Sequence, residues 1–439
     1  MRKKKNAFTL IELLAVIVIL AVILVIAIPR ILDVIETSKK DSFKNAAQLI
    51  ADSAEKKKVS DKLLGKDEEI TCKDVAKIND EDYASCIISF DSEGNAKVSI
   101  TGKGKFDGLK ITNGTKENAE VKEITKPTYG MKAVEYITNL LEYDGVGLKK
   151  DNTPDQNIRY YGSDPDNYVR FNNELWRIIG VFGNNVKLVR SESLGSLSWD
   201  SSESSVNGGQ GINQWGESTY TSGNIYEGAD LQVYLNKMYY GGTEVTCYGG
   251  RNNSTTTCPS GSLNEESKTL IDNHIWKTGA VEWNIQTDTL AFYQNERGTT
   301  NGTKTGKDIC SDSMGSNCND TIIRTTEWTG YIALPYVTDW AYASDENKCE
   351  TKMFALRSYS DPLCNSNNWL GEIRNVMVLS PDTSMSSGIC PTVWNGRSIY
   401  NNYPSTSTLI YPSIYLKSNV IIESGNGSES NPYMFKLNS

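Results

Sequence analysis

Histidine is almost absent from this 439-residue chain, and several catalytic sequence patterns are absent altogether. The single histidine is His274, which excludes a metal site or a catalytic apparatus built on several histidines. No C-x-x-C pair occurs, which argues against zinc ribbons and thioredoxin-type redox sites. No G-x-S-x-G nucleophile elbow, P-loop or dinucleotide fingerprint is present. The sequence therefore predicts that the protein is not an enzyme and needs no cofactor.

The balance of charge limits the kinds of partner. Asp and Glu number 54 against 45 Lys and Arg, so the formal net charge is −9. An acidic chain of this kind argues against a broad nucleic-acid-binding surface, and no nucleic-acid site is evident in the sequence. Hydrophobic residues make up 38% of the chain, enough to build cores, and its length suggests two or three domains.

Two groups of residues in the sequence are candidate chemical sites. His274 lies in the segment 271–276, which we expect to be helical, and a structural or surface role is favoured over a catalytic base. Asp164, Asp166 and Asn167 carry oxygen ligands that could touch calcium. Their segment lacks the repeated ligand spacing of an EF-hand loop, so a solvated turn is favoured. We assign no catalytic, cofactor-binding or metal-binding residue.

Nine cysteines are present, and eight of them form pairs that are close in sequence. The pairs are Cys72 with Cys86, Cys247 with Cys258, Cys310 with Cys318, and Cys349 with Cys364. Short loops closed in this way suit disulfides in an oxidising compartment, although ordinary buried thiols are the alternative. Pairing of nearest neighbours is a hypothesis, because eight cysteines permit about 105 arrangements. Cys390 is left over, and a buried free thiol is favoured over a reactive one.

The strongest signal lies at the N-terminus. A basic block at 2–5 precedes a run of 21 residues, 8–28, whose single charge is Glu12. An apolar run of that length can cross a bilayer core as a helix, and the basic block predicts that its N-terminal end stays cytoplasmic. No A-x-A cleavage site follows the run, so an ordinary secretory signal peptide is the weaker interpretation.

The string Ala-Phe-Thr-Leu-Ile-Glu at 7–12 resembles the cleavage and methylation site of type IV prepilins and pseudopilins. In that family a prepilin peptidase cuts between a small residue and Phe and methylates the new amino group. The resemblance implies cleavage between Ala7 and Phe8 and N-methylation of Phe8, although the family usually has Gly where this chain has Ala7. Glu12 then stands fifth and Pro29 twenty-second in the mature chain, as in the family. It also implies that Glu12 pairs with the amino group of Phe8 on a neighbouring subunit during assembly.

The helical pattern continues beyond Pro29 and becomes amphipathic from Phe43 to Ala54, and Pro29 is expected to kink the helix. We predict an α+β protein in which a long N-terminal pilin helix carries a small antiparallel β head and a large loop-rich α+β domain follows. The predicted parts are a leader peptide (1–7), a transmembrane and stalk helix (8–60), a small pilin head (61–125), a helix and linker (126–160) and a large extracellular domain (161–439).

The predicted large domain differs in composition from the rest. All nine tryptophans lie at or after Trp176. The segments 171–180, 415–420 and 430–433 resemble an uncharacterised extracellular domain of Firmicutes, and the loop-rich layout resembles C-type-lectin-like domains. Neither resemblance implies functional residues. Exposed aromatic side chains could bind a surface glycan or a protein ligand, but packing in the core is favoured for any single one.

Three functions compete. The first is a minor or tip subunit of a type IV pilus whose large domain binds a surface or a partner. The second is a pseudopilin of a type II secretion or competence DNA-uptake machine, and the third, favoured least, is a surface enzyme anchored by a pilin helix. The expected partners are the prepilin peptidase, the membrane and other pilin subunits, bound through the N-terminal helix. The expected location is the cell membrane, spanned once, and then an extracellular filament or the cell surface.

Overall fold

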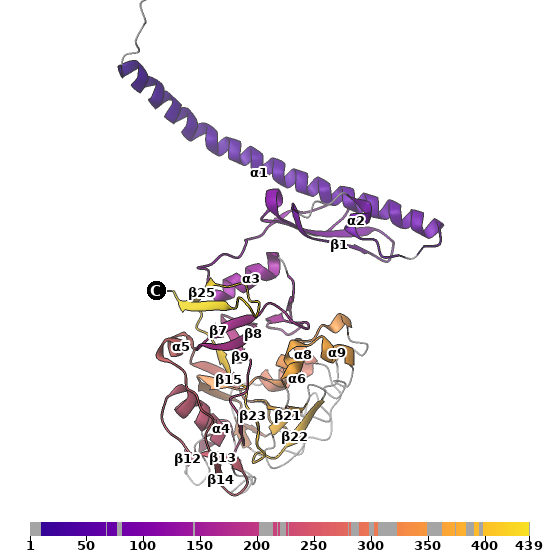
Figure 1. Ribbon diagram of the computed structural model, residues 1–439. Coiled ribbons are helices and arrows are strands. Elements are labelled where there is room, and N and C mark those ends of the chain that lie inside the picture. Colours follow the sequence, from indigo (N-terminus) through magenta and orange to yellow (C-terminus); the bar gives the residue numbers. More distant parts are fainter. Residues whose placement is uncertain are drawn as a thin grey trace, which may run out of the picture. The chain divides into compact units, whose positions relative to one another are not determined.

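The computed structural model forms two compact units, whose elements Figure 1 labels. It describes residues 10–66, 68–76, 81–143, 145–201, 214–216, 218–219, 225–226, 228–279, 281, 289–297, 303–305, 323–348, 362–373, 375–382, 390–394 and 398–438. The first unit comprises Met1–Lys126 and Glu142–Asp144, and the second comprises Pro127–Leu141 and Gly145–Ser439. Each unit has its own hydrophobic core.

The first unit is built on one long helix, α1 (Leu10–Leu63). Its C-terminal half is amphipathic, and Phe43, Ala47, Ile50 and Ala54 recur at helical spacing and are buried. The small alanines let a sheet approach the helix closely. Because these residues share one stripe, the helix is held by packing along that stripe, as the sequence pattern predicted.

A four-stranded antiparallel sheet covers that stripe. Its strands, in spatial order, are β1 (Tyr83–Phe90), β2 (Ala96–Gly102), β3 (Leu109–Gly114) and β4 (Lys122–Glu123). Alternate residues of β2, Val98 and Ile100, point into the core with Ile111 of β3. The turn between β1 and β2 is fixed by Asp91, whose Oδ1 accepts hydrogen bonds from the backbone N–H groups of Glu93 and Asn95 at 3.0 and 2.9 Å. The predicted small antiparallel head is therefore confirmed.

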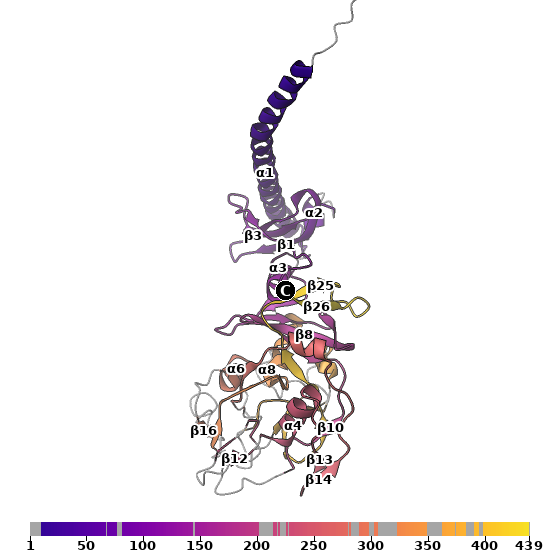
Figure 2. The same cartoon turned by 90° about the vertical axis from the view of Figure 1, so that its left-hand side faces the viewer.

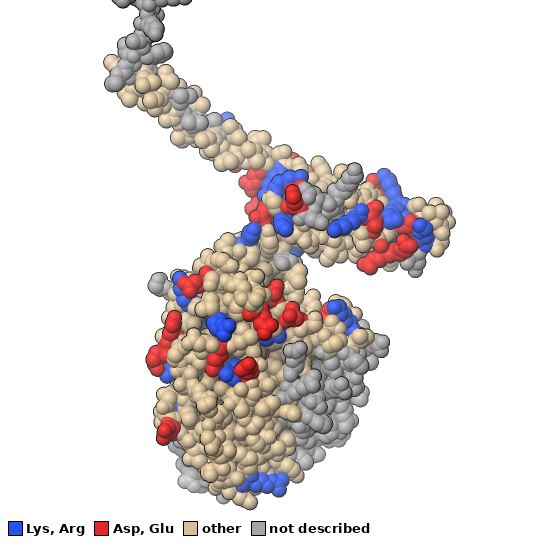
Figure 3. All heavy atoms as spheres, viewed as in Figure 1, with Lys and Arg blue, Asp and Glu red and all other residues tan. Residues whose placement is uncertain are grey.

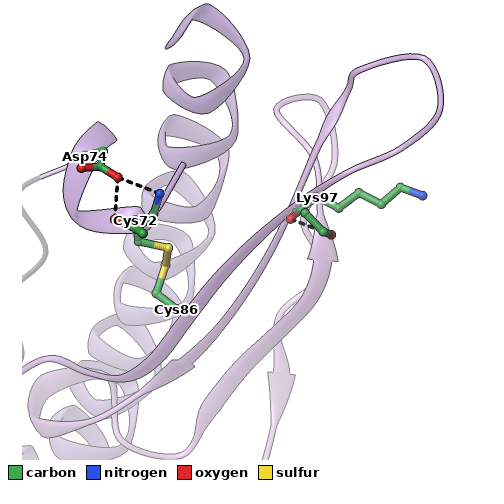
Figure 4. Close-up of a disulfide and its surroundings, with 6 residues drawn as sticks. Cys72, Asp74, Cys86 and Lys97 are labelled. Carbon is green, nitrogen blue, oxygen red and sulfur yellow. Dashed lines mark hydrogen bonds between the residues drawn. A yellow bond between two sulfur atoms is a disulfide. The ribbon is translucent and has the colours of Figure 1, made fainter. Parts of the chain in front are cut away.

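A disulfide closes the first unit beside the end of α1. Cys72, on the short helix α2 (Cys72–Val75), is bonded to Cys86 of β1, with Cα atoms 6.2 Å apart (Figure 4). Asp74 orders the start of α2, because its Oδ2 accepts hydrogen bonds from the backbone N–H and the hydroxyl of Thr71 at 2.8 and 2.6 Å. A 3₁₀ turn, η1 (Gly104–Phe106), completes this unit.

The second unit is organised by a nine-stranded sheet. Its main path runs β19 (Ile332–Ala333), β24 (Ser413–Tyr415), β9 (Asn185–Arg190), β8 (Glu174–Phe182), β7 (Tyr168–Phe171), β26 (Tyr433–Leu437) and β25 (Val420–Ser424). Off that path, β6 (Ile158–Tyr160) pairs with β8 and with β5 (Leu148–Lys150). The pairs are antiparallel except β7 with β26, which joins strands more than 250 positions apart.

A separate five-stranded sheet lies in the same unit. Its order is β10 (Ser196–Leu197), β23 (Thr408–Leu409), β20 (Val376–Met377), β21 (Cys390–Trp394) and β22 (Ser398–Asn402). The two-stranded sheets pair β11 (Ser218–Thr219) with β12 (Ile225–Tyr226), β13 (Cys247–Gly250) with β14 (Ser254–Thr256), β15 (His274–Lys277) with β18 (Glu327–Gly330), and β16 (Thr303–Thr305) with β17 (Ile323–Thr325).

Short helices and turns fill the spaces around these sheets. They are α3 (Ala133–Tyr143), α4 (Asp230–Val233), the π-helical turn η2 (Tyr234–Tyr240), α5 (Glu265–Leu270), α6 (Thr289–Arg297), α8 (Val337–Tyr342), α9 (Pro362–Ser366) and the 3₁₀ turns η3 (Glu346–Lys348) and η5 (Trp369–Glu372). Antiparallel sheets with a few helices, preceded by a long helix, confirm the predicted α+β class. Residues 145–160, which the sequence assigned to a linker, contain β5 and β6 and belong to the second unit.

Tryptophan packing accounts for much of the second core. The buried tryptophans are Trp176, Trp199, Trp215, Trp276, Trp340 and Trp369. Two of the indole N–H groups donate to backbone carbonyls: Trp340 donates to Leu370 at 2.8 Å and Trp369 to Tyr160 at 2.9 Å. Many of the aromatic residues of this region therefore pack in its hydrophobic core.

The predicted cysteine pairs are confirmed in two cases. Cys72–Cys86 is one, and Cys247–Cys258, with Cα atoms 5.2 Å apart, closes the β13–β14 hairpin. Cys364 is also disulfide-bonded, and its partner is not among the described side chains. Cys310, Cys318 and Cys349 and the side chain of Cys390 lie outside the description, so the pairs Cys310–Cys318 and Cys349–Cys364 and the free Cys390 stay predictions.

The double variant Cys72→Ser with Cys86→Ser should destabilise the first unit by roughly 3 kcal/mol, since the bond closes a loop with a sequence separation of 14. Amide hydrogen exchange within residues 43–111 would measure the loss. Tryptophan fluorescence reports the second unit alone, because every tryptophan lies in it, and should show an unchanged unfolding transition.

The matched control is Cys247→Ser with Cys258→Ser, which removes a bond of sequence separation 11 from the second unit. It should shift the fluorescence transition and leave exchange in the first unit unchanged. Unchanged exchange protection in the Cys72 and Cys86 double variant would contradict the assigned role.

Candidate functional site

The N-terminal half of α1 exposes an unusual number of apolar side chains. Between residues 11 and 35 the exposed large hydrophobic residues are Ile11, Leu13, Leu14, Val16, Ile17, Val18, Ile19, Ile23, Val25, Ile28, Ile31, Leu32, Val34 and Ile35. Figure 3 shows few charged side chains along this stretch, whereas charged residues gather over the part of α1 that carries the sheet. We call residues 11–35 the apolar segment of α1. Apolar surface of this extent is typical of a contact with lipid or with another protein.

The residues predicted to act in processing and assembly lie at or near this segment. Ala7 and Phe8 lie outside the described residues. Glu12 lies on α1, and nothing is described of its side chain. Pro29 lies inside α1, which continues as a helix on both sides of it. Figure 2 shows that α1 bends in its N-terminal half, while the kink assigned to Pro29 itself stays a prediction.

Among the helices of the described residues, none is both long and apolar enough to be a candidate for crossing a membrane.

A comparison with protein families identifies a known sequence motif that overlaps the apolar segment of α1. Residues 2–28 match the prokaryotic N-terminal methylation motif. This motif, of the type IV pilin type, contains the predicted cleavage pair Ala7 and Phe8, and Glu12, while Pro29 follows it directly. The match supports a type IV pilin-like or pseudopilin protein that a prepilin peptidase processes and that assembles with other pilins.

No curated protein and no solved structure matches the chain. The resemblance of the second unit to a Firmicutes extracellular domain therefore has no support from a relative. The segment 171–180 covers the end of β7 and most of β8, 415–420 covers the turn from β24 to β25, and 430–433 leads into β26, so all three lie in or beside strands of the nine-stranded sheet. The methylation motif remains the part of the chain for which a family is found.

His274 lies in a strand, which corrects the predicted helix at 271–276. α5 ends at Leu270, and β15 pairs with β18 so that Trp276 lies opposite Trp328. The imidazole stacks on Tyr415 with ring centroids 3.7 Å apart, and its Nδ1 lies 3.0 Å from Oδ2 of Asp272. Burial lowers the pKa of His274, which favours the neutral ring in this packing. These contacts favour the structural role that the sequence suggested.

Two of the three residues considered for calcium, Asn167 and Asp164, have side-chain contacts within the protein. The Oδ1 of Asn167 accepts a hydrogen bond from Nε of Arg177 at 2.7 Å, and its amide donates to the carbonyl of Ile178 at 2.8 Å. Asp164 accepts from Arg177 at 3.2 Å. Within the described part of the chain, no group of three or more His, Cys, Asp or Glu side chains is placed to hold a metal ion.

A buried charge cluster, which the sequence did not reveal, lies in the second unit. Asp339 of α8 is fully buried and accepts contacts from three cations: Lys187 of β9, Arg159 of β6 and Arg297 of α6. The distances are 2.6 Å from Lys187 Nζ to Oδ2, 2.8 Å from Arg159 Nη1 to Oδ1, and 2.7 Å from Arg297 Nη2 to Oδ1. A second carboxylate, Asp151, accepts from Nε of Arg159 at 2.9 Å.

The electrostatics of the cluster follow from its burial. Burial raises the pKa of Asp339, but the three surrounding cations outweigh that effect and hold the pKa of its carboxyl well below the usual range. Burial also lowers the pKa of Lys187 to about 7, although Asp339 opposes the shift. Ion pairs at this depth cost desolvation energy, so each side chain depends on its partners.

The signal that could have found this cluster is a charge inside a strand pattern. Lys187 stands within Val-Lys-Leu-Val of β9, and Arg159 within Ile-Arg-Tyr of β6. A lysine or an arginine in a strand buried on both faces requires a buried anion. The sequence could not tell that the anion is Asp339, because it lies 152 positions from Lys187.

Replacing Arg159 by Met should lower the free energy of unfolding of the second unit by about 3–5 kcal/mol. The reason is that Asp151 loses its guanidinium partner and Asp339 loses one of its own while both stay buried. Urea unfolding followed by tryptophan fluorescence measures the loss.

The matched control is Lys436→Met, which breaks the exposed ion pair of Lys436 with Glu423 in the same unit. Because solvent screens such a pair, its loss should cost less than about 1 kcal/mol. Equal losses in the free energy of unfolding for the two substitutions would show that burial does not raise the cost of breaking the ion pairs of the cluster.

Proposed function

We propose that this protein is a minor or tip subunit of a type IV pilus-like filament, displaying its second unit outside the cell for adhesion or partner binding. The observation that carries the proposal is the methylation motif at residues 2–28, continuous with the apolar segment of α1. The motif supplies a processing signal, and the exposed apolar side chains supply a surface that needs lipid before assembly and neighbouring helices after it.

The size of the second unit supports a minor or tip position. It comprises Pro127–Leu141 and Gly145–Ser439, more than twice the length of the first unit. When helices pack side by side in a filament, every subunit needs room for whatever follows its helix. A bulky unit is accommodated more easily at an end, or at intervals, than at each position along a shaft.

The proposed assembly step depends on the attraction between the carboxylate of Glu12 and the amino group of Phe8 on a neighbouring subunit. A carboxylate within an apolar helix costs free energy, on the order of 2.5–3.5 kcal/mol at the centre of a bilayer. The amino group of Phe8, freed by cleavage, would give Glu12 of a neighbouring subunit an opposite charge in a low-dielectric setting. The uncut leader would leave no amine at that position, which would couple assembly to processing.

The first test is the mature N-terminus. We expect cleavage between Ala7 and Phe8, so that the mature chain begins with N-methylated Phe8, detected by mass spectrometry of protein from membranes. The variant Ala7→Gly, which restores the usual residue of the family, should be cut at the same bond. An intact Met1, or a cut after Ile28, would refute the pilin-like processing on which the proposal depends.

The second test separates anchoring from assembly. Glu12→Ala should leave the membrane content of the protein unchanged and lower its content in sheared filaments, because the incoming amine loses its carboxylate partner. The matched control is Glu36→Ala, which removes a carboxylate from the same helix at a site where Glu36 pairs with Lys40 of its own chain.

Equal incorporation of the Glu12 and Glu36 variants would contradict the assembly role. Immunolabelling of the wild type gives the position in the filament. Label at filament ends or at scattered points supports the proposed position, uniform label along the shaft contradicts it, and label confined to the membrane favours the pseudopilin alternative.

A further inference from the structure

The ion pair between Lys187 and Asp339 differs from the surface ion pairs of this protein in being completely buried. Both side chains have no exposed surface, and Nζ of Lys187 lies 2.6 Å from Oδ2 of Asp339. Because Cγ of Asp339 is one bond of about 1.2 Å from Oδ2, Nζ lies within roughly 3.8 Å of that carbon. A reactive contact between a nucleophile and a carbonyl carbon needs about 3–3.5 Å, which the pair reaches with a small shift.

We propose that Lys187 and Asp339 condense after folding into a side-chain amide bond, a covalent link between β9 and α8. This modification goes beyond the proposed pilin-like function and does not depend on it. It would join residues 152 positions apart in the sequence. The contacts around Asp339 supply what the reaction requires.

The first requirement is stabilisation of the charge that develops on Asp339. Its Oδ1 accepts hydrogen bonds from Nη1 of Arg159 at 2.8 Å and from Nη2 of Arg297 at 2.7 Å. Attack on Cγ places negative charge on that oxygen, and two fixed guanidinium groups stabilise it in the manner of an oxyanion hole. The other oxygen, Oδ2, faces Lys187 and the backbone N–H of Tyr336, at 2.9 Å from the latter, and is the leaving oxygen.

The reaction balances without any external reagent. The ammonium of Lys187 first transfers a proton to Oδ2 across their hydrogen bond, against the low pKa of Asp339, which gives a small population of neutral amine and neutral carboxylic acid. The amine attacks Cγ, forming the Nζ–Cγ bond and an oxyanion at Oδ1. A second proton passes from Nζ to Oδ2, the Cγ–Oδ2 bond breaks, and water departs. Nζ keeps one hydrogen, so an ammonium and a carboxylate become an amide and one water molecule.

The second requirement is a dry site with a fraction of neutral amine. Aromatic rings surround Nζ of Lys187, with the centroid of Tyr336 at 4.3 Å, Trp276 at 5.4 Å, and Tyr415 at 5.5 Å. Burial lowers the pKa of Lys187 to about 7, so a neutral amine is accessible near neutral pH. A dry pocket also favours condensation over hydrolysis, because the water that is formed leaves for bulk solvent.

The charges that remain after condensation are still compensated. The reaction removes one cation and one anion, Lys187 and Asp339. Arg159 keeps Asp151 at 2.9 Å, and Arg297 keeps its electrostatic attraction to the adjacent buried Glu296. The amide oxygen stays an acceptor for both guanidinium groups. Of the lysine side chains that the structure describes, Lys187 is the one that is buried.

Mass spectrometry of the full-length chain tests the bond. After reduction of the disulfides and denaturation, the measured mass of the wild type should be lower by about 18 Da than the mass calculated for the chain from its observed N-terminus. This difference is the mass of one water molecule. Proteolysis should yield one branched peptide in which the segments around Lys187 and Asp339 are joined. Recovery of the two segments as separate linear peptides would overturn the proposal, whatever the behaviour of any variant.

Two variants locate the change. Lys187→Arg keeps a cation on β9 but cannot form the amide, so it should show its full calculated mass. Lys417→Arg replaces a lysine of the same unit whose Nζ donates to the carbonyl of Thr269, and should keep the loss of about 18 Da. A loss that persists in Lys187→Arg would assign it to another dehydration in the chain and refute the proposed bond.

Discussion

The first unit depends on one constraint: α1 must be stable in two different surroundings along its length. Its C-terminal half buries Phe43 and the small residues that follow it against a sheet, an arrangement that an isolated protein in water can satisfy. In its N-terminal half, the large hydrophobic residues between Ile11 and Ile35 whose side chains the structure describes are exposed. A helix of 54 residues therefore cannot be understood from the first unit alone, since nearly half of it awaits another environment.

The second unit contains much irregular chain, and specific contacts are needed to hold that chain in one arrangement. Its strands are short, and strands remote in sequence pair, as β7 does with β26. Hydrophobic packing is not directional, so it does not by itself choose one arrangement of such segments. The contacts of Asp339 are directional, and they tie α8 to β6, β9 and α6 at once. Buried ionic contacts of this kind can specify an arrangement even where they add little stability.

The sequence predicted local structure well and remote contacts poorly. The amphipathic stretch from Phe43 to Ala54 and the pairing of Cys72 with Cys86 are both local in the sequence, and the structure confirms both. The two asparagines between β7 and β8, Asn172 and Asn173, adopt the positive φ that a two-residue hairpin turn needs. The segment 271–276 was assigned to a helix instead of β15, because its structure depends on pairing with β18, more than 50 positions away.

The same difference between local and remote contacts separates the two candidate sites. The predicted processing site rests on a pattern of fixed spacing within a single segment, and Ala7, Phe8 and Glu12 of this pattern lie inside the matched methylation motif. The charge cluster around Asp339 could not be predicted, because its members come from four elements and no spacing joins them. Lys187 and Arg159 inside apolar strands call for a buried anion, but an anion that lies far away in sequence is found only when the chain is folded.

Covalent links would help the second unit to resist unfolding in the setting that the pilin-like proposal implies. If the second unit is displayed on a filament, as proposed, it would meet changing solvent and pulling forces, under which its noncovalent contacts would break one after another. Cys247–Cys258 restrains only its own hairpin, since it spans 11 positions. A bond between β9 and α8 would instead enclose 152 positions, so that extension could not separate the sheet from the helices that carry Arg297 and Asp339. The entropy that such closure removes from the unfolded chain grows only slowly with loop length. Its larger effect would therefore be mechanical, because it fixes which parts of the unit can be pulled apart.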